Sequence, residues 1–174
     1  MPETRLPETR RAKIRREAAA LAKVIAVALM FRAFVAQAYV IPSESMVPTL
    51  QIDDHVYVNR LAYRLSPPVP GDIIVFDHPR EHGTELIKRV VAVGGDHVVA
   101  HDGQVWVNGV ARGPSFDFAA LEVPRDNLFV MGDNRDNSAD SRYWGTVPLG
   151  LVDGRAFVIW WNGTHPTRSL TLLR

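Results

Sequence analysis

Two residues that are far apart in the sequence carry the strongest chemical signal in this chain. Ser45 follows directly after an apolar stretch, and Lys88 lies within the largely apolar run 86–92. A serine hydroxyl becomes a useful nucleophile when a base takes its proton, and a neutral lysine amine can be that base. An ordinary lysine has a pKa of about 10.4, so burial would have to lower the pKa by roughly 2–3 units, or about 3–4 kcal/mol. The pair predicts serine nucleophilic catalysis with a lysine base. Histidine is the commoner base, and six are present, but none falls in a motif that pairs it with Ser45.

A strand is predicted to position Lys88. Alternate side chains of a strand share one face, which groups Lys88 with Leu86, Val90 and Ala92. On such an apolar face the ammonium loses its water, and its pKa falls. Arg89 is expected on the opposite face, in solvent. Other interpretations stay open for each residue alone, because Lys88 also fits an edge-strand charge that prevents aggregation and Ser45 fits a turn or cap.

A third polar segment, residues 132–142, has the sequence Gly-Asp-Asn-Arg-Asp-Asn-Ser-Ala-Asp-Ser-Arg and is predicted to be a loop. It does not fit a calcium loop starting at Asp133, because Arg135 occupies a ligand position and no glutamate closes the loop. Residues 78–82 match a zinc motif, but that motif needs a helix and Pro79 lies in a predicted turn. We therefore expect no metal and no cofactor.

The N-terminal region is predicted to anchor the chain in a membrane. A basic tail, residues 1–16, precedes a mostly apolar stretch over residues 17–41. A bilayer core of about 30 Å needs about 20 helical residues, so this stretch is long enough to cross once. Its charged members, Lys23 and Arg32, can extend toward the headgroups. The basic flank predicts a cytoplasmic N-terminus and an extracytoplasmic remainder.

Two alternatives for this region remain open. Ala36-Gln37-Ala38 has the pattern of a signal-peptide cleavage site, in which case residues 1–38 would be removed. Lys23 and Arg32 make a poor apolar region for such a peptide. The second alternative is an amphipathic helix that lies on the membrane surface.

The remainder, residues 42–174, is predicted to form a single, mainly antiparallel β domain. The net charge of +1 gives no sign of a nucleic-acid partner, and the absence of cysteine excludes disulfides and cysteine-ligated zinc. Runs of β-branched and aromatic residues between turn signals predict the main strands. These strands are expected at 55–58, 72–76, 86–93, 104–107, 128–131 and 156–161.

Together, these segments resemble the type I signal peptidases. The resemblance covers nearly the whole chain and rests on residues 43–50, 70–76 and 132–142, with Lys88 between the last two. It implies a β domain of the signal-peptidase type behind one transmembrane helix in the plasma (inner) membrane. Such a protein removes N-terminal signal peptides from exported preproteins and cuts after small residues at positions −1 and −3. The implied partners are preprotein signal peptides and the lipid bilayer, without nucleic acid or metal.

The resemblance also implies a role for individual residues. Ser45 would be the nucleophile, and Lys88 the general base and later the proton donor to the leaving amine. Ser43 would donate to the oxyanion together with the backbone N–H of Ser45, and Ser138 would orient the lysine.

Supporting roles follow from the same resemblance. Asp140 and Arg142 would form an ion pair that shapes the site, although both also fit a purely structural role in the loop. Leu50 and Ile87 would lie near the pockets for the small substrate residues, and both equally fit ordinary packing. Glu44 stands where the family usually has a small residue. The short segment between Gly95 and Pro124 implies that the second β subdomain of larger members is absent or minimal.

Two rival functions remain. A self-cleaving repressor with a Ser–Lys pair would need a DNA-binding N-terminal domain, and the apolar stretch over 17–41 argues against one. The other rival is a non-catalytic, membrane-tethered domain that binds export substrates.

Overall fold

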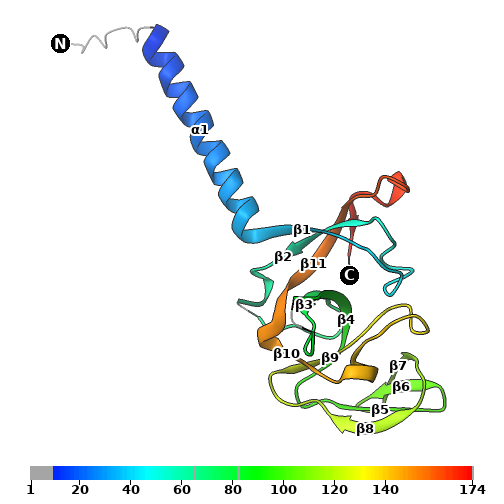
Figure 1. Ribbon diagram of the computed structural model, residues 1–174. Helices are drawn as coiled ribbons and strands as arrows, with labels where there is room; N and C mark the ends of the chain where they lie inside the picture. The colour runs from blue at the N-terminus through cyan, green and yellow to red at the C-terminus, as the bar shows by residue number, and fades with distance from the viewer. Residues whose placement is uncertain (1–9, 65, 82, 174) are drawn as a thin grey trace.

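The computed structural model describes residues 10–64, 66–81 and 83–173, which form one long helix and a β body from which the helix projects (Figure 1). Helix α1 spans Arg10–Val35, and the short helix α2 spans Ser141–Trp144. The strands of the described residues are β1 (Ala36–Val40), β2 (His55–Asn59), β3 (Ile73–Asp77), β4 (Glu85–Val93), β5 (His97–His101), β6 (Gln104–Val107), β7 (Val110–Pro114), β8 (Phe118–Glu122), β9 (Asn127–Met131), β10 (Val147–Pro148), β11 (Val152–Trp161) and β12 (Thr171–Leu172). Three single 3-10 turns complete them: η1 (Ala62–Arg64), η2 (Leu149–Leu151) and η3 (Pro166–Arg168).

The strands form two antiparallel sheets. The larger one has the order β1-β2-β11-β3-β4-β9-β10, with β12 paired to β11, and the smaller one has the order β7-β6-β5-β8. The mainly antiparallel β fold expected from the sequence is therefore confirmed. The segment between Gly95 and Pro124, where at most a minimal second subdomain was expected, forms the four-stranded sheet.

The core explains why the strands stand where they do. Ile73, Ile74, Val75 and Phe76 are all buried, because β3 lies in the interior of the larger sheet with β11 and β4 on either side. The turn segment at 43–50 also contributes to this core, because its apolar side chains pack in the same cluster as those of β2 and β3. The turn is thereby fixed against the sheet that carries Lys88.

The structure corrects one boundary of the predicted membrane segment. Residues 36–40 were placed inside the apolar stretch 17–41, but they form β1, which pairs with β2 from Ala36↔Asn59 to Val40↔His55. Helix α1 therefore ends at Val35.

The described side chains of α1 stand in solvent. Leu21, Val24 and Val27 are each more than 60% exposed. Within the part of the chain that the structure describes, no helix has both the length and the apolar character that crossing a membrane requires. The described part does not include residues 1–9 or the side chains of residues 28–36. Arg32, which was expected to extend toward the headgroups, is one of these side chains.

Candidate active site

Ser45 lies in a turn that is held from both sides. On the inner side, Met46 and Leu50 are 0% exposed and pack in the core. On the outer side, the Asn134 backbone N–H donates to the Ser45 carbonyl at 3.1 Å, and Asn134 Nδ2 donates to the Glu44 carbonyl at the same distance. The turn also contains a cis peptide bond between Val47 and Pro48. These contacts fix the backbone of Ser45 against the 132–142 loop.

Lys88 reaches Ser45 from the interior of β4. Its backbone pairs with Ile74 of β3, and its side chain is only 4% exposed. Lys88 Nζ donates a hydrogen bond of 2.7 Å to Ser45 Oγ. The structure thus brings together the serine and the lysine that the sequence singled out.

The surroundings of Lys88 favour its neutral form. Burial lowers the pKa of Lys88 to about 8, because the ammonium has lost most of its water. The carboxylates of Asp140 and Asp133 act in the opposite direction and raise the pKa. Desolvation is the larger effect, so Lys88 can give up its proton near neutral pH.

The two predicted hydroxyls of the 43–50 segment lie together. Ser43 Oγ is 3.4 Å from Ser45 Oγ, Ser43 is exposed, and Ser45 is half-buried. A molecule in solvent can therefore approach both hydroxyls, whereas Lys88 stays covered behind them. This arrangement suits a nucleophile with a desolvated base at its back.

The 132–142 loop is organised around a buried ion pair. Arg142 Nε donates to Asp140 Oδ1 at 2.8 Å, and the side chains are 1% and 0% exposed. Asp140 also caps α2, and its Oδ2 accepts from the Gly132 N–H at 3.0 Å. Arg142 Nη2 in turn donates to the Arg135 carbonyl at 2.8 Å. The pair therefore holds both ends of the loop in place.

Ser138 lies inside this loop with its hydroxyl buried. Among the described residues, Ser138 Oγ has no hydrogen-bond partner. A Cβ built on Gly132 would run into both Ser138 Oγ and the Ser45 carbonyl oxygen, so these two groups lie close to the same glycine. Ser138 is therefore close to the Ser45 backbone, and its role in orienting Lys88 remains a prediction.

Arg89 departs from the sequence-based expectation of a solvated side chain. It makes a bidentate ion pair with Asp133, with Nε to Oδ1 at 2.8 Å and Nη2 to Oδ2 at 2.7 Å. Arg89 Nη1 also donates to the Gly71 carbonyl at 2.7 Å. The sequence did not predict this ion pair. The available signal was Asp133, an acidic residue at the start of the polar loop, as a partner for Arg89, the charged neighbour of Lys88.

Of the two predicted pocket residues, Leu50 is enclosed by the core. Its side chain is 0% exposed, so it has no surface for a substrate to touch in this conformation. Ile87 is only partly buried and packs against the same cluster. The structure thus assigns Leu50 a packing role and leaves Ile87 with an open surface.

Glu44, the departure from the family pattern, stands outside the Ser45–Lys88 contact. Its side chain is exposed, and Glu44 Oε2 accepts from Asn137 Nδ2 at 3.4 Å. It is not among the groups that shift the pKa of Lys88.

Comparisons with known proteins show which family this chain is similar to. The chain matches the family described as "Signal peptidase, peptidase S26" over residues 14–117 and 112–161. It is 41% identical over 149 residues to the probable signal peptidase I-2 of Synechocystis sp., covering 79% of this chain and 68% of that protein. It is 32% identical over 222 aligned positions to signal peptidase I of Aquifex aeolicus, covering 88% and 87%. A crystal structure of a signal peptidase I from Enterococcus faecalis aligns at 30% identity and a TM-score of 0.47, covering 52% of this chain and 97% of that one.

Proposed function

This chain belongs to the signal peptidase family, peptidase S26, and removes signal peptides, and we propose that it does so as a serine endopeptidase in which Ser45 attacks and Lys88 is the base. The observation that carries the proposal is the hydrogen bond of 2.7 Å between Lys88 Nζ and Ser45 Oγ. No other described lysine or histidine donates to Ser45.

The reaction begins with attack on the scissile carbonyl. Neutral Lys88 takes the proton from Ser45 Oγ while the oxygen bonds to the carbonyl carbon. With a pKa of about 8, roughly one in ten Lys88 side chains is neutral at pH 7. The serine is thus activated without a histidine.

The developing negative charge needs donors that are already in place. Ser43 Oγ, 3.4 Å from Ser45 Oγ, is one, and the backbone N–H of Ser45 is the other. Removing one such donor typically costs about 10²–10³ in rate.

The intermediate then collapses as Lys88 returns its proton to the leaving amine, the start of the mature protein. The signal peptide is left as an ester on Ser45. Water attacks this ester and passes a proton to Lys88, which protonates Ser45 as the acid leaves. Lys88 thus acts as base and acid in turn.

The loop residues position Lys88 rather than touch the substrate. We assign the orientation of the lysine to Ser138, whose buried hydroxyl has no hydrogen-bond partner among the described residues and is therefore open to one. The Asp140–Arg142 pair holds the loop that carries Ser138. Small residues at −1 and −3 of the substrate are selected by shallow pockets, with Ile87 at the wall.

We further propose that α1 anchors the enzyme to the plasma membrane in a single pass, with the N-terminus in the cytoplasm and the β body outside. The exposed Leu21, Val24 and Val27 support this, since exposed apolar side chains along one helix need a cover. Resistance of the full chain to alkaline extraction from membranes, and protease access from outside only, test the anchor and its orientation.

The catalytic proposal is tested by cleavage of a preprotein with Ala at −1 and −3, in detergent. Wild type should release a mature protein whose mass places the cut after that alanine, and Ser45→Ala should not. If Ser45→Ala binds the preprotein and cuts it at the wild-type rate, Ser45 is not the nucleophile. If neither folded protein cuts, a non-catalytic, membrane-tethered domain that binds export substrates becomes the better account.

A further inference from the structure

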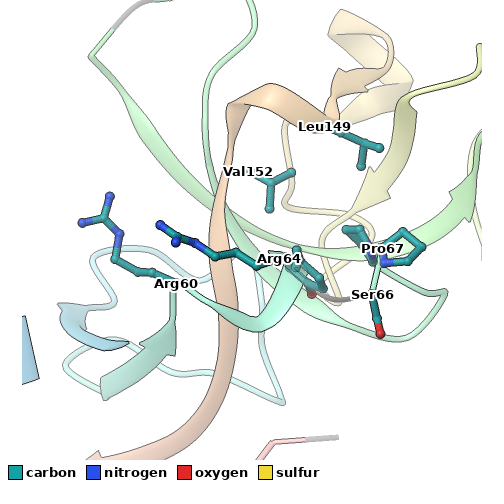
Figure 2. Close-up of a pocket in the computed structure, with 8 residues that line it drawn as sticks. Arg60, Arg64, Ser66, Pro67, Leu149 and Val152 are labelled. Carbon is teal, nitrogen blue, oxygen red and sulfur yellow. The ribbon is translucent and has the colours of Figure 1, made fainter. Parts of the chain in front are cut away.

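A cavity of about 420 Å³ opens between the segment after β2 and the junction of η2 with β11. No residue of the Ser45–Lys88 site lines it. Its lining combines cationic, hydroxyl and apolar groups, shown as sticks in Figure 2. The cavity therefore needs an explanation apart from catalysis.

The lining is chemically divided. Arg60 and Arg64 lie on one side, and Leu149, Val152 and Pro67 lie on the other (Figure 2). Guanidinium groups suit oxyanions such as phosphate, with several N–H donors in one plane. An apolar wall beside them suits a ligand that carries hydrocarbon. The lining thus fits an anionic amphiphile.

Of the two arginines that line the cavity, only one has an acidic partner among the described residues. Arg60 Nη2 pairs with Asp153 Oδ1 at 2.7 Å, which engages one nitrogen of its guanidinium. Among the described residues, no carboxylate or carbonyl pairs with the Arg64 guanidinium, and Arg64 is exposed. Asp72, the other nearby acid, is occupied by Tyr63 Oη at 3.0 Å and Arg155 Nε at 3.0 Å. An incoming anion would meet Arg64 first.

The cavity lies at the end of the sheet that joins α1. Arg60 directly follows Asn59, and Asn59 pairs with Ala36, the first residue after α1. Figure 1 shows the segment after β2 below the C-terminal end of the helix. If α1 enters a bilayer, this pairing places the cavity close to the headgroup layer.

We propose that this cavity binds the phosphate group of an anionic phospholipid, with Arg64 and Arg60 on the phosphate and the glycerol and upper acyl chain against Leu149 and Val152. The proposal rests on the membrane anchoring proposed above. It does not depend on the Ser45–Lys88 chemistry. Free inorganic phosphate offers the same anion without the hydrocarbon, so the test separates the two.

The test is native mass spectrometry of the full chain released from a non-ionic detergent. Dioleoyl phosphatidylglycerol is titrated in, with dioleoyl phosphatidylcholine as the zwitterionic counterpart. Arg64→Gln is compared with Arg80→Gln, which removes another exposed arginine that lies outside the cavity. All proteins carry Ser45→Ala, so lipid binding is measured whether or not the catalytic proposal holds.

Arg64→Gln should lower the affinity for phosphatidylglycerol about tenfold, because a charge-assisted hydrogen bond is lost. Arg80→Gln should bind it as the parent does, and phosphatidylcholine should not distinguish the variants. The basic side chains of α1 give every protein the same background. Equal phosphatidylglycerol affinity in Arg64→Gln and the parent, both folded by thermal unfolding, would overturn the proposal. Displacement of the lipid by equimolar inorganic phosphate would overturn the lipid assignment and leave a free-phosphate site.

Discussion

Lys88 Nζ lies 2.7 Å from Ser45 Oγ, although the two residues are 43 positions apart in the sequence. The lysine comes from the interior of β4, and the serine from a turn that its apolar neighbours fix in the core. Lys88 is 4% exposed, whereas Ser45 is half-buried. The base is therefore desolvated while the nucleophile remains open to substrate, and the chemistry depends on this difference.

The rate of cleavage should depend on the protonation of Lys88. Because only the neutral amine accepts a proton, kcat/KM should rise with pH and level off above the pKa of about 8. Initial rates measured on one preprotein from about pH 6 to about pH 10 check this. A midpoint near the ordinary histidine pKa of about 6.5 would instead indicate a histidine base.

Asp133→Asn should move that midpoint to lower pH. The Asp133 carboxylate raises the pKa of Lys88, so neutralising it makes the ammonium easier to deprotonate. Asp136→Asn, in the same loop, is the matched control, because Asp136 is exposed and is not among the groups that shift the pKa of Lys88. The two pH profiles are compared on folded protein. A shift of the same size in both variants would show that the loop, and not the charge, is responsible.

Lys88→Met should abolish cleavage and yet stabilise the protein. Burial lowers the pKa of Lys88 in the folded state, so the unfolded state binds more protons between about pH 8 and about pH 10.4, and stability rises with pH across that window. Below about pH 8, Lys88 is charged in the folded state, and the desolvation of the buried ammonium lowers the free energy of unfolding by its full amount. Removing the amine should raise the free energy of unfolding at pH 7 by about 1–3 kcal/mol.

The neighbouring substitution, Arg89→Met, should lower the free energy of unfolding. It leaves Asp133 without its bidentate partner in a half-buried setting, which should cost about 1–3 kcal/mol. Chemical denaturation of both variants at pH 7 measures the two effects. If Lys88→Met and Arg89→Met destabilised the protein by a similar amount, this would contradict the assignment of Lys88 as a desolvated base.

Gly132→Ala should disrupt the site by crowding. A Cβ there would collide with Ser138 Oγ and the Ser45 carbonyl oxygen, and the backbone oxygen cannot simply rotate away. We expect a loss of stability of about 1–3 kcal/mol and a drop in kcat. Gly150→Ala is the control, because nothing lies within 4 Å of a Cβ at that position. Both variants are assayed for thermal unfolding and for preprotein cleavage.

The sequence predicted the strands whose pattern is strong. The four consecutive apolar residues at 73–76 and the alternation around Lys88 both correspond to strands of the larger sheet. It did not predict β7 and β8, because their residues are mostly exposed and give no periodic apolar signal. β1 was hidden for another reason, since its residues continue the apolar composition of α1 and only the pairing with β2 separates them.

The candidate site shows the same division. Ser45 and Lys88 were recognisable only together with the 132–142 segment, because each residue alone also fits a structural role. The partner of Arg89 was not, because strand alternation gives the face of a side chain but not what covers that face. Leu50 was expected near a pocket and lies in the core, since apolar character alone does not distinguish the two settings.

The most direct measurement is the titration of the Lys88 amine itself. The chain contains only three lysines, Lys13, Lys23 and Lys88, so selective ¹³Cε labelling gives three NMR signals, and Lys88→Met identifies the third. In the full chain, Lys88 should titrate with a midpoint of about 8. A midpoint at the ordinary lysine value of about 10.4 would contradict the account, because Lys88 would then be charged whenever Ser45 has to lose its proton.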